Sequence, residues 1–316
     1  RRQTLSLAAG AAATPLLALG LSEISPALSF GLELTSDGRV IVAEITPSWV
    51  RVTRLTYEDA TVRITEAPLA DLYRLANAYL ARRAQAGAIS IHLPEVDIRV
   101  VDGEVTLQPV ASQPSRVLVE NAMIMTGEAL AAFALERDIP MPFSTQEPPD
   151  DQGSGSRERE SGVGSSVSLS AMFALRRTFK RSQYRAAPAL HSGLGLAAYT
   201  QATSPMRRYL DLVAHQQVRA YLRGERLLTA DKILERVGAT EAAVGAVRQA
   251  ERLSNQHWTL VYLLQHEGWR GDGVLVERRD RNSVVLIPEL GWETHMPVPG
   301  DLPLDSVLHL KSTQVD

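Results

Sequence analysis

The sequence contains no cysteine. This absence excludes disulfides, thiolate nucleophiles and thiolate metal sites from the chain, and it fits a cytoplasmic protein. The seven histidines are scattered and show no metal-ligand spacing such as HExxH. The net charge of −3 gives no sign, over the whole chain, of a nucleic-acid partner. What is present, 45% apolar and 22% charged residues over 316 positions, is ordinary for a soluble globular protein of one large domain or two.

The segment Arg1–Leu21 imitates the signal of an exported protein, because two arginines precede an Ala- and Leu-rich run. Pro15 and Gly20 interrupt that run, and it is too short to span a bilayer. The chain begins with Arg rather than Met, so we expect it to be cut from a longer polypeptide and to contact no membrane. An exported protein with a twin-arginine signal is the alternative, and it fails if a methionine and folded sequence lie upstream.

The first hundred residues predict a hairpin and a helix. Residues 31–53 alternate between apolar and polar positions around a Ser-Asp-Gly turn at 36–38, which is typical of a β-hairpin. Asp71–Ala86 repeats apolar residues at helical spacing and is followed by Gly87, a stop signal.

A second group of elements follows. Short strands are predicted at 89–91 and 96–101, the latter followed by a hairpin turn at Asp102-Gly103. A helix is predicted over 115–137, with Ser115 as its N-terminal cap.

The rest of the chain changes character twice. Residues 146–166 are almost free of apolar side chains, so we expect a mobile loop. Residues 228–266 predict a helix that ends near Gly268. Short strands separated by turn residues suit a small β-barrel of the OB type, at 273–276, 283–287 and 307–310. We therefore predict an α+β protein: residues 1–268 form a mixed domain of sheet packed with helices, and residues 269–316 form the barrel.

The charge is unevenly distributed along the chain. A segment of about fifty residues holds only two acids, Asp211 and Glu225, against ten cations: Arg176, Arg177, Lys180, Arg181, Arg185, Arg207, Arg208, Arg219, Arg223 and Arg226. Such a patch attracts a polyanion by counterion release. Aromatic rings stand between the cations, as single-stranded nucleic acid requires, because bases stack while phosphates pair. The alternative is a basic face that is merely solvated.

One helix start within this segment favours phosphate binding. Thr203 or Ser204 is suited to cap a helix, and Pro205 to occupy its first position. Arg207 and Arg208 are then expected in the first turn, where cations oppose the helix dipole and lower stability unless an anion lies beside them. A phosphate there would meet free backbone N–H groups, hydroxyls and a guanidinium.

Two further side chains share that helix face. Asp211 follows Arg207 by four residues and Arg208 by three, so it can orient one of them, and His215 follows Asp211 by four. The alternative is an ordinary helix with a surface salt bridge and a capping histidine. We favour the phosphate site, because two arginines placed against the dipole need a reason.

The chain resembles the catalytic domain, called RNB, of the ribonuclease II/R family. The motif that carries the resemblance is Gly193-Leu-Gly-Leu, Tyr199-Thr and Thr203-Ser-Pro-Met-Arg-Arg-Tyr, with Asp211 and His215. Other segments agree in order: Val50–Ala60, Gly87–Glu95 and Val117–Met123. Residues 271–316 take the place of the family's C-terminal RNA-binding OB domain. The resemblance covers nearly the whole chain and implies an RNB-type mixed α/β catalytic domain followed by that barrel.

The resemblance also implies roles for single residues. Arg207 is expected to contact the phosphate near the scissile bond, Glu120 to lie at the active-site end of its helix, and Tyr57 to stack near the RNA 3′ end. Glu120 and Tyr57 also have plainer interpretations, as a surface acid and a half-buried ring. Asp211 and His215 are expected to orient the arginines. Further RNA contacts are expected from His191, Arg176, Lys180, Tyr199, Thr203, Ser204, Arg208 and Tyr209.

The sequence departs from the family in two places. The family hydrolyses RNA with Mg²⁺ held by aspartates spaced Asp-x5-Asp-x-Asp-Asp, and no such cluster exists here. The nearest acids, Asp150-Asp151 and Glu158 with Glu160, have the wrong spacing. We therefore expect no metal ligand in this chain, the aspartates to lie outside it, and the chain alone to be inactive. In addition, Ser6 stands where some relatives carry a base-clamping tyrosine.

The resemblance implies a processive 3′→5′ exoribonuclease that hydrolyses single-stranded RNA to nucleoside 5′-monophosphates by a two-metal mechanism. We expect a monomer that works in RNA turnover. The alternative is an RNA-binding protein of the same fold that does not cut. An Asp-x5-Asp-x-Asp-Asp run upstream of Arg1 would separate the two hypotheses.

Overall fold

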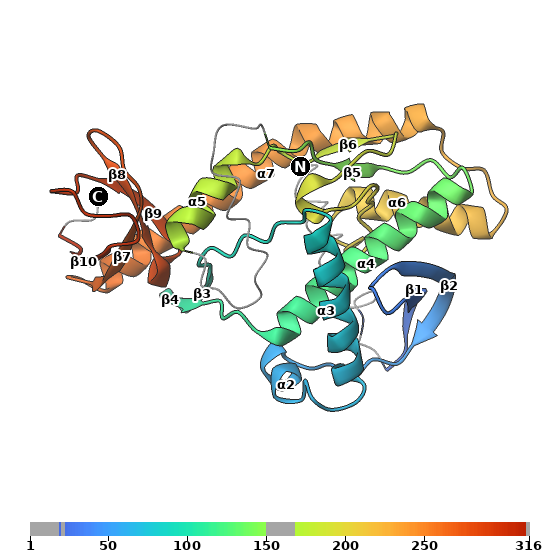
Figure 1. Ribbon diagram of the computed structural model, residues 1–316, viewed down its shortest axis with the longest axis horizontal. Helices are drawn as coiled ribbons and strands as arrows, with labels where there is room; N and C mark the ends of the chain where they lie inside the picture. Colours follow the sequence, from blue (N-terminus) through green and yellow to red (C-terminus); the bar gives the residue numbers. More distant parts are fainter. Residues whose placement is uncertain (1–18, 20–22, 150–167, 314–316) are drawn as a thin grey trace. The chain divides into compact units, whose positions relative to one another are not determined.

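The computed structural model describes residue 19 and residues 23–149 and 168–313. The predicted signal-like segment, Ser6 and most of the predicted mobile loop lie outside these residues. The described residues mix helices and sheets, which confirms the α+β class (Figure 1). The chain divides into two compact units, of which the first comprises Arg1–Ile89, Ser112–Pro148 and Lys180–Ala242. The second comprises Ser90–Ala111, Pro149–Phe179 and Ala243–Asp316. The predicted domain boundary at Gly268 stays a prediction.

The first unit begins with a long antiparallel hairpin. Strands β1 (Ser25–Leu34) and β2 (Val40–Val50) pair with Phe30 opposite Ile45, and a register shift follows Gly31. The hairpin predicted over 31–53 is thus confirmed, with strands that start earlier than expected. The buried side chain of Ile45 attaches this hairpin to the core of the unit.

Helices supply the rest of the first unit. They are α2 (Tyr57–Val62), α3 (Leu69–Gln85), α4 (Pro114–Glu136), α6 (Tyr209–Leu222) and the first part of α7 (Ala230–Gln265). The predictions of helices over 71–86, 115–137 and 228–266 are confirmed within two residues at each end. Two short paired strands, β5 (Phe143–Thr145) and β6 (Gln183–Arg185), and a 3₁₀ turn, η1 (Ser192–Leu194), complete the unit.

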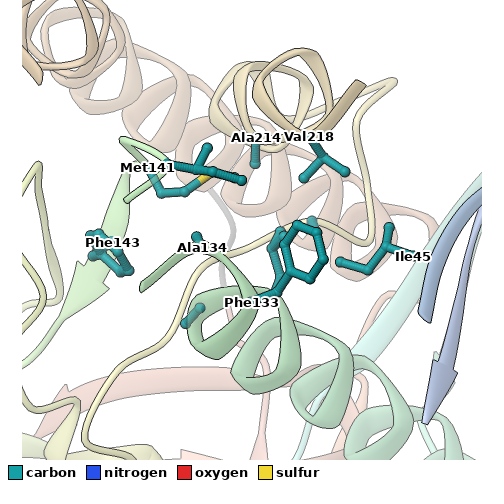
Figure 2. Packing of buried hydrophobic residues seen from close by; sticks show 11 residues of the cluster. Ile45, Phe133, Ala134, Met141, Phe143, Ala214 and Val218 are labelled. Carbon is teal, nitrogen blue, oxygen red and sulfur yellow. The ribbon is translucent and has the colours of Figure 1, made fainter. Parts of the chain in front are cut away.

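Helix α4 forms the centre of this unit. Figure 2 shows Phe133 of α4 next to Ile45 of β2, with Ala214 and Val218 of α6 in the same cluster. Helix α4 is also long and apolar enough to cross a membrane, with a mean hydropathy of 1.4. However, 50% of its apolar stretch is buried inside the protein. The packing identifies it as a core helix.

The start of α4 differs from the prediction. Gln113 is the N-cap and Pro114 the first helical residue, so Ser115 is not the cap. The hydroxyl of Ser115 instead donates to the carbonyl of Tyr57 at 2.8 Å and lies 2.8 Å from the hydroxyl of Thr61. A contact with α2 has therefore replaced the local capping bond.

The second unit contains a hairpin, a short helix, the rest of α7 and a four-stranded sheet. Strands β3 (Val96–Val101) and β4 (Glu104–Pro109) turn at Asp102 and Gly103, which have φ of 52° and 86°, so this predicted hairpin is confirmed. Residues 89–91 were predicted as a strand, which is wrong: the N–H of Ile89 bonds to the carbonyl of Gly193, and no ladder forms.

The sheet of the second unit is antiparallel in the order β10-β7-β8-β9. Its strands are β7 (Arg270–Glu277), β8 (Ser283–Ile287), β9 (Trp292–Met296) and β10 (Val307–Lys311), and η2 (Pro288–Leu290) joins β8 to β9. Helix α5 (Leu169–Thr178) packs Phe173 against Val276, Val284 and Leu286. Within the described residues the sheet stays open, with β10 and β9 at its edges, so the predicted closed barrel is not confirmed.

Candidate functional site

The predicted helix start at Thr203 to Pro205 is wrong. Arg208 is the N-cap of α6 in an extended conformation, with φ −119° and ψ 116°, and Tyr209 is the first helical residue. Arg207 lies in a separate turn before the helix, where its N–H bonds to the carbonyl of Ser204 at 3.2 Å. The two arginines therefore do not occupy the first helical turn, and the dipole argument for them does not apply.

A buried carboxylate holds this turn. Asp211 is 0% exposed, and its Oδ2 accepts the N–H of Ser204 at 2.9 Å and Nη2 of Arg208 at 2.7 Å. Nη2 of Arg208 also donates to the hydroxyl of Thr203 at 3.1 Å. Asp211 thus orients Arg208, as one of the two predicted options, and it holds Ser204 in the turn before the helix. The side-chain cap expected of Thr203 or Ser204 is wrong, since no side chain caps α6.

Arg207 is left exposed beside this network. It makes no hydrogen bond or ion pair through its side chain within the described residues. A guanidinium on a fixed backbone turn, with no carboxylate to satisfy it, is suited to bind an anion from solvent.

His215 acts on the backbone. Its Nε2 lies 2.6 Å from the carbonyl of Ala202, to which it donates, and burial lowers the pKa of its imidazole. The neutral ring therefore ties α6 to the residue that precedes the Thr203–Arg208 turn. His215 was predicted to orient the arginines. It contacts neither of them by a hydrogen bond within the described residues, and it acts on them only through the backbone of Ala202.

Tyr199 and His191 pack together inside the first unit. They are 7% and 8% exposed, with ring centroids 5.8 Å apart in an edge-to-face arrangement. Tyr199 fits closely against α4, because a Cβ added to Gly127 would lie 2.2 Å from Cε2 of the ring. Burial raises the pKa of Tyr199 to about 12 and lowers that of His191 to about 4. Both residues support the fold here, and their contact with RNA stays a prediction.

Glu120 lies in the first half of α4, and Tyr57 of α2 lies beside that half. Tyr57 is 37% exposed, and the guanidinium of Arg116 lies 4.2 Å from its ring centroid. Arg116 precedes Glu120, which is exposed, by one helical turn. No hydrogen bond or ion pair between described residues joins Glu120 or Tyr57 to Arg207. Tyr209 is 44% exposed and accepts a hydrogen bond from Arg236 at 2.5 Å.

The structure sorts the basic segment into paired and unpaired cations. Six of its ten members form ion pairs: Arg176 with Glu293, Arg177 with Glu277, Lys180 and Arg185 with Glu147, Arg208 with Asp211, and Arg223 with Glu225. Between described residues the remaining four form none: Arg181, Arg207, Arg219 and Arg226. Arg176 and Arg177 belong to the second unit and the others to the first, so the ten do not form one patch within a unit.

Sequence reasoning missed one residue close to these side chains, Arg83. It is 3% exposed in α3 and donates to the carbonyl of Leu194 and to Oδ1 of Asn121. A signal was present: Ala76, Tyr79 and Arg83 fall on one helix face by their spacing, and the first two are apolar. An arginine in an apolar stripe indicates a buried guanidinium.

The described residues contain no group of three or more His, Asp or Glu side chains that could hold a metal ion. In this part of the chain, therefore, the side chains do not fit a Mg²⁺ centre.

The buried imidazole of His191 should make stability depend on pH. The folded protein keeps it neutral down to a pKa of about 4, whereas the unfolded chain binds the proton near 6.5. The unfolded state therefore binds more protons between these values, and the free energy of unfolding should fall as the pH drops from 6.5 toward 4. Denaturant titrations of the wild type and His191→Gln over this range measure the effect. The variant's stability should vary less with pH, and parallel curves would contradict the assignment.

Comparisons with known proteins agree with the fold. The RNB domain family matches residues 3–224. An uncharacterised ribonuclease of Synechocystis, sll1290, is 36% identical over 312 residues, which cover 92% of this chain and 44% of that protein. The chain thus spans less than half the length of this curated relative.

Two solved structures share the fold at low sequence identity. RNase R of Mycoplasma genitalium, in complex with ribose-methylated single-stranded RNA, is 15% identical with a TM-score of 0.70, over 92% of this chain and 55% of that one. Yeast Ssd1, described as a pseudonuclease, is 17% identical with a TM-score of 0.61, over 89% of this chain and 40% of that one. Since the family match takes in well over half of the sequence, the chain belongs to the RNB domain family.

Proposed function

We propose that this chain is part of a 3′→5′ exoribonuclease that hydrolyses single-stranded RNA to nucleoside 5′-monophosphates. The observation that carries the proposal is the exposed Arg207, which has no carboxylate partner among the described residues and stands on a turn fixed by buried Asp211. The family match and the relative named a ribonuclease support the same activity.

In this proposal Arg207 binds the non-bridging oxygens of the scissile phosphate. Its attraction increases as negative charge develops on those oxygens, so it lowers the barrier as well as holding the substrate. Arg208 is engaged by Asp211 and Thr203, and it keeps the turn in place. The Mg²⁺ ions implied by the resemblance require carboxylates other than those described here.

Other parts of the proposal concern the setting of the reaction. We propose that the open sheet of the second unit is part of an OB barrel that grips the incoming strand, with β10 and β9 as the edges to be closed. We also propose that the protein is a cytoplasmic monomer. Gel filtration with light scattering on the full-length protein tests whether it is a monomer.

The activity is tested with the full-length protein and a 5′-labelled RNA of about 30 nucleotides. A 3′→5′ exoribonuclease keeps the 5′ label on the shortened strand until a short labelled end product remains, and it releases nucleoside 5′-monophosphates. The reaction should stop on addition of EDTA and resume with excess Mg²⁺. Label appearing first in a mononucleotide would instead indicate attack from the 5′ end.

A non-catalytic RNA-binding protein is the second candidate. It is favoured by the likeness to a structure described as a pseudonuclease and by the lack of a metal-binding group among the described residues. Such a protein would retard the same RNA in a gel and leave it intact in Mg²⁺ and in Mn²⁺. Reading the sequence upstream of Arg1 for an Asp-x5-Asp-x-Asp-Asp run gives an independent answer.

A further inference from the structure

Arg83 is a buried cation with two directed contacts. It lies in α3 and is 3% exposed, and its guanidinium is 5.5 Å from the centroid of the Tyr79 ring. Nε donates to the carbonyl of Leu194 and Nη1 to Oδ1 of Asn121, both at 2.9 Å. These acceptors come from two segments more than seventy residues apart in the sequence. One side chain therefore ties three parts of the unit together.

Burying the charged guanidinium of Arg83 lowers stability. Burial lowers the pKa of Arg83, which means that the protein interior penalises its charge. Neither direct acceptor is charged, and the carboxylates of Glu120 and Glu128 act on it only from beyond ion-pair distance. A leucine or methionine would fill the same space without that penalty. What only arginine supplies is a planar fork with donors in two fixed directions.

The two acceptors lie next to predicted site residues. Asn121 adjoins Glu120 on α4. Leu194 lies in the turn that follows His191, and the chain continues from it to Tyr199. Arg83 thus connects the turn of α4 that carries Glu120 with the segment 191–199 that leads into the Thr203–Arg208 turn.

The same segment is held firmly around this contact. The N–H of Gly193 donates to Oε1 of Gln146 at 3.0 Å, and its carbonyl accepts the N–H of Ile89 at 3.1 Å. Gly195 has φ of +64°, and a Cβ there would lie 2.7 Å from the carbonyl oxygen of Arg83. The end of α3 and the 191–199 segment therefore fit closely together, and Arg83 is the side chain that hydrogen-bonds both this segment and α4.

We propose that Arg83 is a positioning residue of the candidate site: its guanidinium fixes Glu120 on α4 relative to the 191–199 segment. The proposal rests on the proposed function in so far as Glu120 and the turn carrying Arg207 serve the same reaction. Arg83 itself acts through its neighbours and touches no substrate.

The test compares Arg83→Lys with a matched control, Arg82→Gln, in the full-length protein. Arg82 is the next residue of α3 and is also partly buried, but its Nη2 pairs with Glu128 at 2.6 Å and does not reach the 191–199 segment. Arg83→Lys keeps the charge and loses the two-directional fork. It should lower kcat on single-stranded RNA by about 10- to 100-fold, since small misplacements have effects of that size, and leave KM within about threefold. Arg82→Gln should keep kcat within about threefold.

Hydrogen–deuterium exchange provides a readout that needs no activity. Arg83→Lys should speed exchange of amides in 191–200 and in the turn of α4 around Asn121, whereas Arg82→Gln should not. If the wild type does not cleave RNA, the proposed function fails, and exchange alone still decides the positioning role. Unchanged exchange in Arg83→Lys, or equal loss of kcat in both variants, overturns the proposal. If Arg83→Lys does not fold, Asn121→Ala removes one of the two contacts and should give the same pattern more weakly.

Discussion

Replacing Arg207 with alanine in the full-length protein should lower kcat by about 10²- to 10³-fold and raise KM by less than about fivefold. The asymmetry follows from the geometry. Arg207 is exposed and forms no ion pair within the described part of the chain, so its charge is available to a phosphate whose oxygens become more negative during the reaction. Steady-state kinetics on a short single-stranded RNA measures both parameters.

Two further variants separate a reaction-specific role from a general one. Arg207→Lys keeps a positive charge but not the planar fork, and we expect it to recover part of the lost turnover. Arg219→Ala removes another exposed cation that forms no ion pair among the described residues, from the last turn of α6. Arg219→Ala should also raise KM by less than about fivefold and leave kcat little changed. Arg219 lies in the last turn of α6, whereas Arg207 precedes the start of that helix. Equal losses in kcat and affinity for Arg207→Ala would reduce it to one phosphate contact among many.

The elements that the sequence predicts well are those specified by local pattern alone. Helix α7 runs over Ala230–Gln265 against a prediction of 228–266, and the turn at Asp102-Gly103 is where expected. In these cases the spacing of apolar residues, a glycine and local backbone hydrogen bonds are sufficient to specify the element, so distant residues change its bounds little. The same holds for α3, which ends two residues before Gly87.

The start of α6 shows where local rules fail. Thr203, Ser204 and Pro205 have the composition of a helix start, yet the helix begins at Tyr209. The buried carboxylate of Asp211 accepts the N–H of Ser204, so a contact across seven residues holds Thr203 to Arg208 in a turn outside the helix. Burial of Asp211 depends on the packing of α6, and the sequence pattern does not contain that information.

Charge counting fails for a related reason. The sequence shows ten cations in one segment, but not which of them the fold will neutralise. Arg176 pairs with Glu293 and Arg177 with Glu277, at separations of 117 and 100 residues. Arg83 was missed for the converse reason, because an arginine in a helix is ordinarily assigned to the surface. The candidate site could therefore be located by its sequence motif. The structure was needed to show that Asp211 engages Arg208 and leaves Arg207 exposed.

Replacing Asp211 with alanine should lower the free energy of unfolding by about 3 to 5 kcal/mol, the effect of removing one member of a buried ion pair. The change leaves Nη2 of Arg208 and the N–H of Ser204 without their carboxylate acceptor. Arg208 keeps some access to water, with 28% of its side chain exposed, so we expect the lower end of that range. Denaturant titration followed by circular dichroism measures the loss. Asp231→Ala, which removes an exposed acid at the start of α7, is the control and should change stability by less than about 1 kcal/mol.

Two more variants show whether the loss comes from the ion pair. Asp211→Asn keeps one oxygen acceptor without its charge, and it should lose about 1 to 2 kcal/mol, because hydrogen bonds to charged groups are stronger than neutral ones. The Asp211→Ala, Arg208→Ala double variant removes both partners and so leaves no unpaired buried charge. Its destabilisation should be smaller than the sum of the two single losses by more than about 1 kcal/mol. Additive losses would mean that Asp211 stabilises the turn through Ser204 alone, and Arg208 would then join Arg207 as a cation free to bind RNA.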